Sequence, residues 1–359
     1  MVRLVINGTC LEPKPSGLGV YTYEVASRLL TLFPGSLLIL NNGNRLSRPP
    51  TSFPVRRPLS ERLLRNTISV PLVAKRTMGS ILFSPTQLDT GFSFGAPHVV
   101  VVHDITPLIV HKAHGKQFYW YKYLLPRILN RASHIIADSH NTKNDIINLG
   151  ITPPISVVYP GINHQHFFPR NQEAIATIKK KYRLSEYFLY VGNMFPHKNL
   201  SAVIRAHNAS RIDSDLVLVG QKDDRFINDL HHEIRRHNFP SRVKILDYVP
   251  HNDIPALMSG AIAFIYVSLY EGFGLPVLEA MACGAPVITS NTSSLHEISN
   301  GAAVLVNPCS TDDIANAMSK VYNSKQIRVQ LSEGGPTHAK DFSWDNTAAA
   351  LQHIFLDLK

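Results

Sequence analysis

The sequence predicts an α/β protein built from two doubly wound parallel-sheet domains that face each other across a cleft. At 359 residues the chain exceeds what one ordinary hydrophobic core supports. Short apolar runs alternate with helical patterns along both halves, which is typical of βα units around parallel sheets. A segment with proline and glycine, Tyr159 to Asn171, separates the halves. Ligands of such folds bind at the carboxyl ends of the strands, so the cleft is the expected site.

Six strands are expected in each half, because each run is short, apolar and bounded by turn residues. In the first half they are Val2 to Asn7, Ser36 to Leu40, Ile81 to Ser84, Val99 to His103, Ile135 to Asp138 and Ile155 to Val158. In the second half they are Tyr187 to Gly192, Asp215 to Gly220, Val243 to Leu246, Ala263 to Val267, Pro286 to Ser290 and Ala303 to Val306.

These patterns set the expected domain bounds at residues 1–168 and 169–342. The last segment, 343–359, begins with Ser343-Trp344 and continues as a helix expected from Asp345 to Leu358. We expect this helix to pack back on the first domain.

The composition is 44% hydrophobic and 17% charged, which is typical of a globular protein. Cys10, Cys283 and Cys309 show no CxxC spacing, so neither a disulfide framework nor a zinc site is expected and a reducing compartment fits best. The longest apolar runs, residues 99–102 and 261–267, are far shorter than the roughly 18 to 20 residues of a membrane span. A soluble or peripheral protein is therefore expected.

The net charge of +10 is carried by the first half of the chain. Residues 1–170 hold 18 Lys and Arg against 7 Asp and Glu, whereas residues 171–359 hold 18 against 19. Many of the cations fall in one interval: Arg45, Arg48, Arg56, Arg57, Arg62, Arg65, Lys75 and Arg76. Interleaved apolar residues suggest contact with anionic lipid or an anionic acceptor, although a solvated surface covered by arginine stems would look the same. No nucleic-acid-binding signature accompanies the charge.

The strongest local motif runs from Glu271 through Gly272, Phe273, Gly274 and Leu275 to Glu279, and ends at Gly284. It follows an expected strand and contains a glycine-rich loop and then a helix, with Pro276 suited to the first helical turn. Backbone N–H groups at such a helix start suit a phosphate.

Glu271 and Glu279 are predicted to face the same cleft, where paired carboxylates accept hydrogen bonds from sugar and ribose hydroxyls. The plainer alternative is that Glu279 only stabilises the positive end of the helix, by roughly 0.3 to 1 kcal/mol.

With two glutamates separated by seven residues, the motif EGFGLPVLEAMACGAPVI resembles the signature of the retaining GT-B glycosyltransferases of family 4, also called glycosyltransferase group 1. The resemblance covers nearly the whole chain. Further matching segments are Ser16 to Tyr21, His103-Asp104, Ala137 to Ser139, Tyr159 to Asn163, Tyr190 to Asn193 and Lys198-Asn199. It implies two facing Rossmann-like domains, the first binding the acceptor and the second the nucleotide sugar.

The resemblance makes Lys198 the donor-phosphate lysine, in the loop that begins with Gly192 and Asn193. An ammonium group beside a diphosphate helps the nucleotide leave without a metal ion. The family often has arginine where this chain has Asn193, so one cationic contact is missing here. A solvated loop lysine is the alternative interpretation of Lys198.

Gly17 and Gly19 lack the full GxGxxG spacing of a dinucleotide fold, because Thr22 occupies the last place. This disfavours a dehydrogenase. Together with the other motifs, they are predicted to let the backbone approach the donor at the start of a helix from about Val20 to Thr31.

His103 ends an apolar strand and is predicted to project into the cleft, although a lone histidine at such a place is often structural. The resemblance implies that His103 orients the donor sugar, while Asp104 holds the loop or the imidazole. No carboxylate is well placed as a covalent nucleophile. Retention by front-face attack, with the leaving phosphate helping to deprotonate the acceptor, is therefore the expected mechanism.

No catalytic metal is expected. The one Asp-x-Asp motif, Asp213-Ser214-Asp215, lies at the amino end of a strand, away from the cleft, and His231-His232 has no partner at ligand spacing.

The expected function is transfer of a hexose from a nucleotide-diphosphate sugar to a lipid-linked or polysaccharide acceptor. GDP-mannose is the favoured donor, and UDP-hexoses and dTDP-rhamnose are the alternatives. Base contacts are expected around Tyr248-Val249-Pro250, mostly through the backbone. The expected location is the inner face of the cytoplasmic membrane. An epimerase, a phosphorylase, which would need a pyridoxal cofactor, and a non-catalytic sugar-nucleotide-binding subunit are the alternatives.

Overall fold

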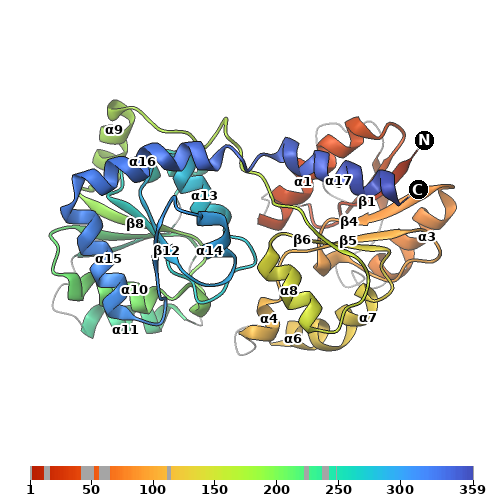
Figure 1. The fold of residues 1–359 in the computed structure, drawn as a ribbon, viewed down its shortest axis with the longest axis horizontal. Helices are drawn as coiled ribbons and strands as arrows, with labels where there is room; N and C mark the ends of the chain where they lie inside the picture. The colour runs from red at the N-terminus through yellow and green to blue at the C-terminus, as the bar shows by residue number, and fades with distance from the viewer. Residues whose placement is uncertain are drawn as a thin grey trace. The chain divides into compact units, whose positions relative to one another are not determined.

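The computed structural model describes residues 2–11, 17–41, 52–55, 65–110, 115–221, 226–236, 242–247 and 249–358. The chain divides into two compact units. Unit 1 comprises Met1–Gly161 and Trp344–Lys359, and unit 2 comprises Ile162–Ser343. The first boundary therefore lies seven residues before the one expected at 168, and the terminal helix belongs to unit 1 (Figure 1).

Unit 1 contains a parallel sheet in the order β3-β2-β1-β4-β5-β6-β7. Its strands are β1 (Arg3–Asn7), β2 (Leu37–Asn41), β3 (Ser52–Val55), β4 (Ser80–Ser84), β5 (His98–Val102), β6 (His134–Ala137) and β7 (Ile155–Val157). All six predicted strands are present, and each end lies within one residue of its predicted position. The prediction missed β3, a four-residue strand with a proline at its third position, which pairs with β2.

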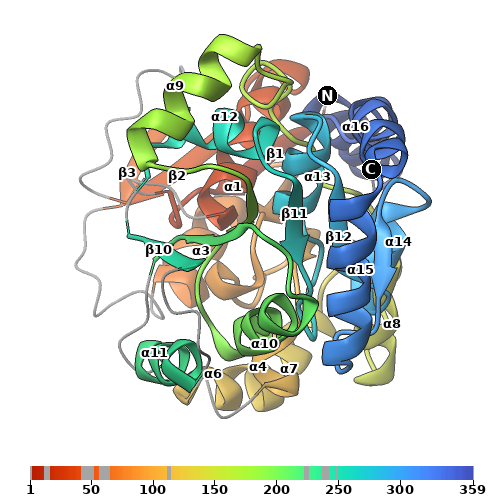
Figure 2. The same cartoon turned by 90° about the vertical axis from the view of Figure 1, so that its left-hand side faces the viewer.

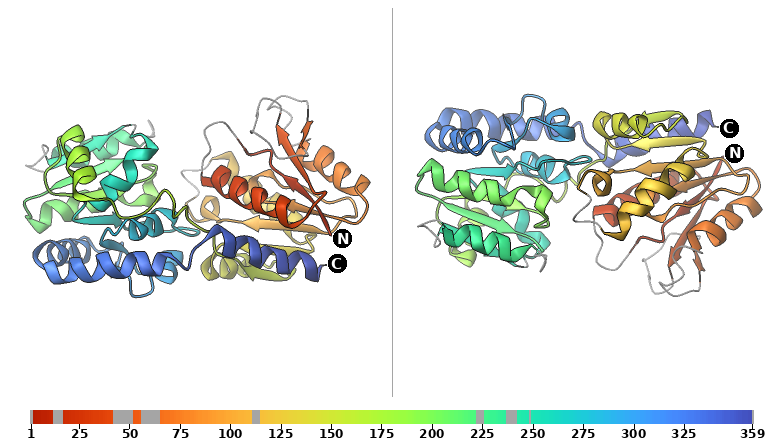
Figure 3. Two further views of the ribbon diagram at one scale, coloured as in Figure 1. Left: turned by 90° about the horizontal axis from the view of Figure 1, so that it is seen from above. Right: turned by 90° about the horizontal axis from the view of Figure 1, so that it is seen from below.

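The helices of unit 1 cover both faces of this sheet. They are α1 (Gly17–Leu32), η2 (Arg65–Ser69), α3 (Val70–Arg76), η3 (Gln87–Asp89), α4 (Thr106–Ile109), α6 (Lys116–Tyr119), η4 (Trp120–Leu124), α7 (Leu125–Leu129), α8 (His140–Asn148) and α17 (Trp344–Asp357). Helix α17 packs on α1 (Figure 3). Its Trp344, Leu351 and Phe355 enter the core formed with β1 and β4. The apolar face of the last helix thus explains why the chain returns to unit 1.

Unit 2 contains a second parallel sheet, in the order β10-β9-β8-β11-β12-β13. Its strands are β8 (Tyr187–Val191), β9 (Asp215–Val219), β10 (Val243–Leu246), β11 (Ala263–Tyr266), β12 (Val287–Ser290) and β13 (Val304–Val306). These are the six strands expected from the sequence. The central strands are nearly all apolar because both faces of a parallel sheet are covered.

Two helical layers enclose the second sheet. The helices are α9 (Gln172–Tyr182), η5 (Pro196–Lys198), α10 (Leu200–Ser210), α11 (Ile227–Arg236), η7 (His251–Asp253), α12 (Ile254–Ser259), α13 (Leu275–Ala282), α14 (Ser293–Ser299), α15 (Thr311–Asn323) and α16 (Lys325–Ala339). Helix α10 packs against α11 and α15, while α12 packs against α9 and α13 (Figure 2). In each sheet the strand order reverses beside the first strand, the position at which doubly wound folds bind ligands.

Candidate active site

The carboxyl ends of β8 and β11 bring together two residues that the sequence predicted for donor binding. Nζ of Lys198, at the end of η5, lies 2.6 Å from Oε1 of Glu271 in the loop before α13. Each side chain is only 12% exposed. Strands β8 and β11 are neighbours in the sheet, so loops that are far apart in the sequence meet at one edge.

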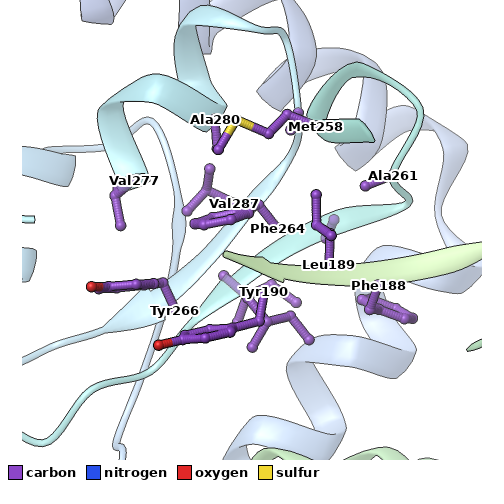
Figure 4. Packing of buried hydrophobic residues seen from close by; sticks show 14 of the residues in the cluster. Phe188, Leu189, Tyr190, Met258, Ala261, Phe264, Tyr266, Val277, Ala280 and Val287 are labelled. Atoms are coloured by element: carbon purple, nitrogen blue, oxygen red, sulfur yellow. The ribbon is translucent and has the colours of Figure 1, made fainter. Parts of the chain in front are cut away.

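Tyr266, which the sequence prediction missed, contacts the lysine of this pair. Nζ of Lys198 donates a hydrogen bond of 3.0 Å to the Tyr266 hydroxyl and lies 5.3 Å from the centre of its ring. The ring of Tyr266 stacks on that of Tyr190, with centres 5.6 Å apart, and both hydroxyls point the same way (Figure 4). The sequence signal that could have indicated this contact is a tyrosine near the end of each of two otherwise apolar strands, Tyr190 in β8 and Tyr266 in β11.

The environments of Glu271 and Glu279 shift the pKa values of their carboxyl groups in opposite directions. Burial raises the pKa of the Glu271 carboxyl, but the charges of Lys198 and His197 outweigh it and the pKa is lowered below its ordinary value. Burial raises the pKa of Glu279 to about 7. The Glu279 side chain is partly exposed, and it makes no hydrogen bond or ion pair within the described parts of the chain. Glu279 is therefore a poorly solvated carboxyl group that a hydroxyl donor would satisfy.

Glycines shape the two loops of this edge. A Cβ at Gly192 would lie 2.8 Å from the Tyr190 hydroxyl, and one at Gly220, after β9, would lie 2.0 Å from the Gly192 carbonyl oxygen. Gly274 has a φ of +118° just before α13, and a Cβ there would approach Leu295 to 2.6 Å. These contacts require the absence of a side chain, and Gly220 adds a close approach that the sequence prediction missed.

The structure places most of the remaining residues predicted for donor binding inside unit 2. Phe273 and Val249 are buried in the core of unit 2, and Leu275 begins α13. The loop beside them includes Gly272, which is also buried. Asn193 is exposed, and its carbonyl oxygen accepts a hydrogen bond of 2.7 Å from Tyr190. Tyr248, named with Val249 as a base contact, lies outside the described residues.

Asn199 holds the lysine loop in place. It adopts a left-handed conformation with a φ of +61°. Its amide group donates to the carbonyl oxygens of Val267, at 3.2 Å, and Pro308, at 2.7 Å. Asparagine tolerates this conformation better than most residues and supplies the two N–H groups that tie three loops together.

The second predicted cluster lies at the carboxyl end of β5 in unit 1. His103 is 7% exposed, and its ring is held at both nitrogens. Nδ1 lies 2.5 Å from Oδ2 of Asp138, and Nε2 lies 2.8 Å from the Pro85 carbonyl oxygen. On sequence alone Asp104 has two possible roles, holding the loop or the imidazole, and the structure separates them. Asp104 holds the loop by accepting from the Thr106 N–H at 2.8 Å, whereas Asp138 holds the imidazole.

The bonds to His103 determine where its protons lie. A carbonyl oxygen only accepts, so Nε2 carries a hydrogen and donates it to Pro85. The proton between Nδ1 and Asp138 is then shared by a buried pair. Burial opposes the charged imidazole, but Asp138 raises the pKa of His103 above its ordinary value, while burial raises that of Asp138. In this state His103 has no nitrogen lone pair available as a general base.

The glycine-rich start of α1 differs from its prediction. Helix α1 begins at Gly17, three residues earlier than expected, so Gly17 and Gly19 lie in its first turn. Gly17 is exposed, and a Cβ there would meet no atom within 4 Å. No described neighbour requires glycine at this position. Ser16 lies outside the described residues.

The Asp-x-Asp motif lies at the amino end of β9, as expected. Asp213 and Asp215 form ion pairs with Arg242 and Lys244, at 2.5 and 2.7 Å. Among the described residues no group of three or more His, Cys, Asp or Glu side chains has the arrangement of a metal site. No helix in that part of the chain is both long and apolar enough to cross a membrane.

Comparison with known proteins identifies the family. Residues 171–338 match the family model of glycosyl transferases group 1, and residues 15–166 match glycosyltransferase family 4. The chain is 31% identical over 271 residues to the O-antigen chain mannosyltransferase B of Escherichia coli, covering 71% of this chain and 70% of that protein. It is also 31% identical over 236 residues to the O-antigen chain mannosyltransferase RfbU of Salmonella typhimurium, covering 65% and 62%.

Solved structures share the fold at low sequence identity. Sucrose-phosphate synthase from Thermosynechococcus elongatus has a TM-score of 0.77 at 19% identity and covers 100% of this chain and 99% of that one. HepE from Anabaena, in complex with UDP and glucose, has a TM-score of 0.79 at 19% identity and covers 99% of both chains. With its two parallel-sheet units, the chain therefore belongs to glycosyltransferase family 4 and is a glycosyltransferase of the GT-B fold.

Proposed function

We propose that this enzyme transfers a hexose, with retention, from a nucleotide-diphosphate sugar to a lipid-linked or polysaccharide acceptor in the assembly of a bacterial surface glycan. Mannose from GDP-mannose is the proposed donor, since the O-antigen relatives are mannosyltransferases. The HepE structures contain UDP or UDP-glucose, which supports a nucleotide sugar as the donor class.

The observation that carries the proposal is the arrangement of Lys198, Glu271 and Glu279 around one strand edge. Lys198 provides a fixed cation for the diphosphate, held by Glu271 and Tyr266. Glu271 contacts the donor sugar, and Glu279 accepts hydrogen bonds from the ribose hydroxyls. The N–H groups at the start of α13 add positive potential for the phosphates.

His103 orients the donor sugar in the proposed reaction, with its imidazole held by Asp138. The departing phosphate takes the proton of the attacking acceptor hydroxyl, on the face that the nucleotide leaves. No step requires a side chain as covalent nucleophile or a metal ion, because Lys198 and the helix N-terminus stabilise the charge that develops on the diphosphate.

The test is a panel of GDP-, UDP-, dTDP- and ADP-sugars, measuring binding and the release of nucleotide with and without a glycan acceptor. Release that depends on the acceptor and prefers GDP-mannose is expected, and Glu271→Ala should abolish it while GDP still binds. Conversion of the sugar without any acceptor would favour the epimerase alternative. Binding without turnover of any donor would favour a non-catalytic subunit.

We also propose that unit 1 docks on anionic lipid at the cytoplasmic membrane, because the excess positive charge lies in residues 1–170. Of the basic residues singled out above, Arg45, Arg48, Arg56, Arg57 and Arg62 lie outside the described residues, while Lys75 and Arg76 end α3. Neutralising Arg56, Arg57, Arg62 and Arg65 together should weaken sedimentation with anionic vesicles. Unchanged sedimentation would remove this segment from the docking surface.

A further inference from the structure

One stretch of unit 1 combines cations and aromatic rings without a single acidic residue. Between Asp104 and Asp138 the sequence contains no Asp or Glu but five basic residues: Lys112, Lys116, Lys122, Arg127 and Arg131. Five of the six residues from 118 to 123 are aromatic. The stretch folds as α6, η4 and α7, directly after the His103 strand end and α4.

The inner side of this helical stretch belongs to the core. Tyr121, Leu125 and Leu129 are buried against β5 and β6. The outer side exposes Tyr119 to 63% and Tyr123 to 50%, and their rings stack with centres 6.4 Å apart. Lys122 lies between them in sequence and is exposed. We refer to Tyr119, Lys122 and Tyr123 as the aromatic–basic face.

These three side chains have the chemistry of a membrane interface. Tyrosine places an apolar ring and a polar hydroxyl at the headgroup level, and lysine keeps its ammonium in water while its stem covers apolar surface. The rings of Tyr119 and Tyr123 lie outside the buried core of unit 1, which the opposite side of the stretch completes. Over the 33 residues between Asp104 and Asp138 no acidic residue accompanies the five cations, which suits an anionic surface.

A glycan is a less suitable occupant of the same face. Sugars stack on the open faces of aromatic rings, whereas here Nζ of Lys122 lies 5.3 Å from the ring centre of Phe118 and 5.4 Å from that of Tyr123. The ring of Tyr119 also stacks on that of Tyr123 and packs edge-on against Phe118, with centres 5.6 Å apart. An anionic headgroup can instead meet the ammonium and the ring edges without displacing these contacts.

The face is built on the same framework as the His103 strand end. The Gln87 amide donates to the Tyr121 hydroxyl at 3.0 Å and to the Asp104 carbonyl oxygen at 3.2 Å. Its oxygen accepts from the His103 N–H at 3.2 Å. A lipid surface bound at the aromatic–basic face would therefore lie against the same end of unit 1 that carries the proposed catalytic histidine.

We propose that the aromatic–basic face docks the enzyme on anionic lipid headgroups, with the rings of Tyr119 and Tyr123 at headgroup level and Lys122 paired with phosphate. The proposal rests on the lipid-linked acceptor of the proposed function and names the surface that would bring the enzyme to it.

The test compares two double variants in sedimentation with phosphatidylglycerol-containing vesicles and with pure phosphatidylcholine vesicles. Tyr119→Gln/Lys122→Gln removes one exposed tyrosine and one lysine of the face. The matched control, Tyr23→Gln/Lys180→Gln, removes an exposed tyrosine of α1 and an exposed lysine of α9. Each lysine near an anionic surface changes partition about fivefold, so the first variant should bind roughly tenfold less and the control like wild type.

Trp120 gives a readout within the same stretch. The chain has two tryptophans, and Trp344 is buried in the core of unit 1. Brominated phosphatidylglycerol should quench the fluorescence of the wild-type protein, and Trp120→Phe should lose that quenching while keeping the Trp344 signal. This measurement needs no turnover, so it can succeed or fail independently of the proposed reaction.

Three outcomes would overturn the proposal. In the first, the wild type binds neither kind of vesicle. In the second, the Tyr119/Lys122 variant binds anionic vesicles as well as the control does; this includes the case in which only the variant neutralised at Arg56, Arg57, Arg62 and Arg65 loses binding. In the third outcome, vesicle binding stays unchanged while KM for a water-soluble acceptor rises, which would assign the face to the glycan.

Discussion

The charged side chains at the carboxyl edges of the two sheets differ in their exposure and in their hydrogen-bond partners. In unit 1, His103 and Asp138 are enclosed, and each ring nitrogen of the histidine is already engaged within the unit. In unit 2, Lys198 and Glu271 are paired at a partly exposed edge, next to a Glu279 carboxyl that has no hydrogen-bond partner among the described residues. The difference supports the proposal that the first edge fixes geometry, whereas the second receives the charged part of the substrate.

The largest effect should come from separating the pair in unit 2. Lys198→Ala should lower turnover by roughly 100-fold or more, about 3 kcal/mol, because it removes the cation and leaves Glu271 buried alone. Steady-state kinetics and chemical denaturation measure the two consequences. Lys181→Ala is the control, since its 2.6 Å pair with Asp253 is on the surface and should matter little. Turnover near wild type in Lys198→Ala would contradict the proposed site.

The enclosed pair of unit 1 should give a smaller loss of turnover. Asp138→Asn replaces the acceptor of the His103 Nδ1 proton and should reduce kcat by roughly 10- to 100-fold, with little change in donor KM. Imidazole nitrogen shifts in NMR should show that Nδ1 loses its proton while Nε2 keeps its own. Asp145→Asn, on the neighbouring helix α8, serves as the control. An unchanged kcat in Asp138→Asn would mean that the His103–Asp138 pair has only a structural role.

Gly220 tests whether unit 2 depends on loop geometry as well as charge. Gly220→Ala introduces a Cβ at 2.0 Å from the Gly192 carbonyl oxygen, so the lysine loop must shift. We expect a loss of about 1 to 3 kcal/mol in the free energy of unfolding and weaker nucleotide binding by calorimetry. Gly334→Ala in α16 meets no atom within 4 Å, so it should leave nucleotide binding unchanged and, inside a helix, raise the free energy of unfolding by about 0.5 to 1 kcal/mol. Wild-type binding in Gly220→Ala would mean that the loop position is not required.

Glu279 provides a pH dependence with a defined sign. Its folded pKa of about 7 exceeds the ordinary value of 4.5, so between these values the folded state keeps a proton that the unfolded state has lost. Folding stability contributed by Glu279 should therefore fall as pH rises from about 4.5 to 7 and then level off. Burial, together with the charge of Glu279, raises the pKa of both Tyr266 and Cys283. Denaturation of wild type and Glu279→Gln across this range should show the slope in the wild type alone.

The smallest expected effect is that of a chelator. In the proposed mechanism Lys198 and the N-terminus of α13 supply the positive potential, so transfer should continue unchanged in EDTA. Activity that disappears in EDTA and returns with magnesium or manganese would contradict this role of Lys198.

By itself, the sequence determined the fold class, both sets of strands, apart from β3, and the motifs with Glu271, Glu279, Lys198 and His103. It did so because buried parallel strands need continuous apolar runs, and because glycines and prolines mark the loops between them. β3 was missed since a four-residue edge strand carries too few apolar positions to stand out.

Only the tertiary structure decided the partners of these residues. Lys198 and Glu271 are 73 residues apart, and His103 and Asp138 are 35 apart, so no local pattern pairs them. The sheet order brings β8 beside β11 and β5 beside β6, and thereby selects Asp138 over the adjacent Asp104. The same packing gives the two glutamates of one motif opposite pKa shifts, because a pKa depends on burial and neighbouring charge rather than on residue type.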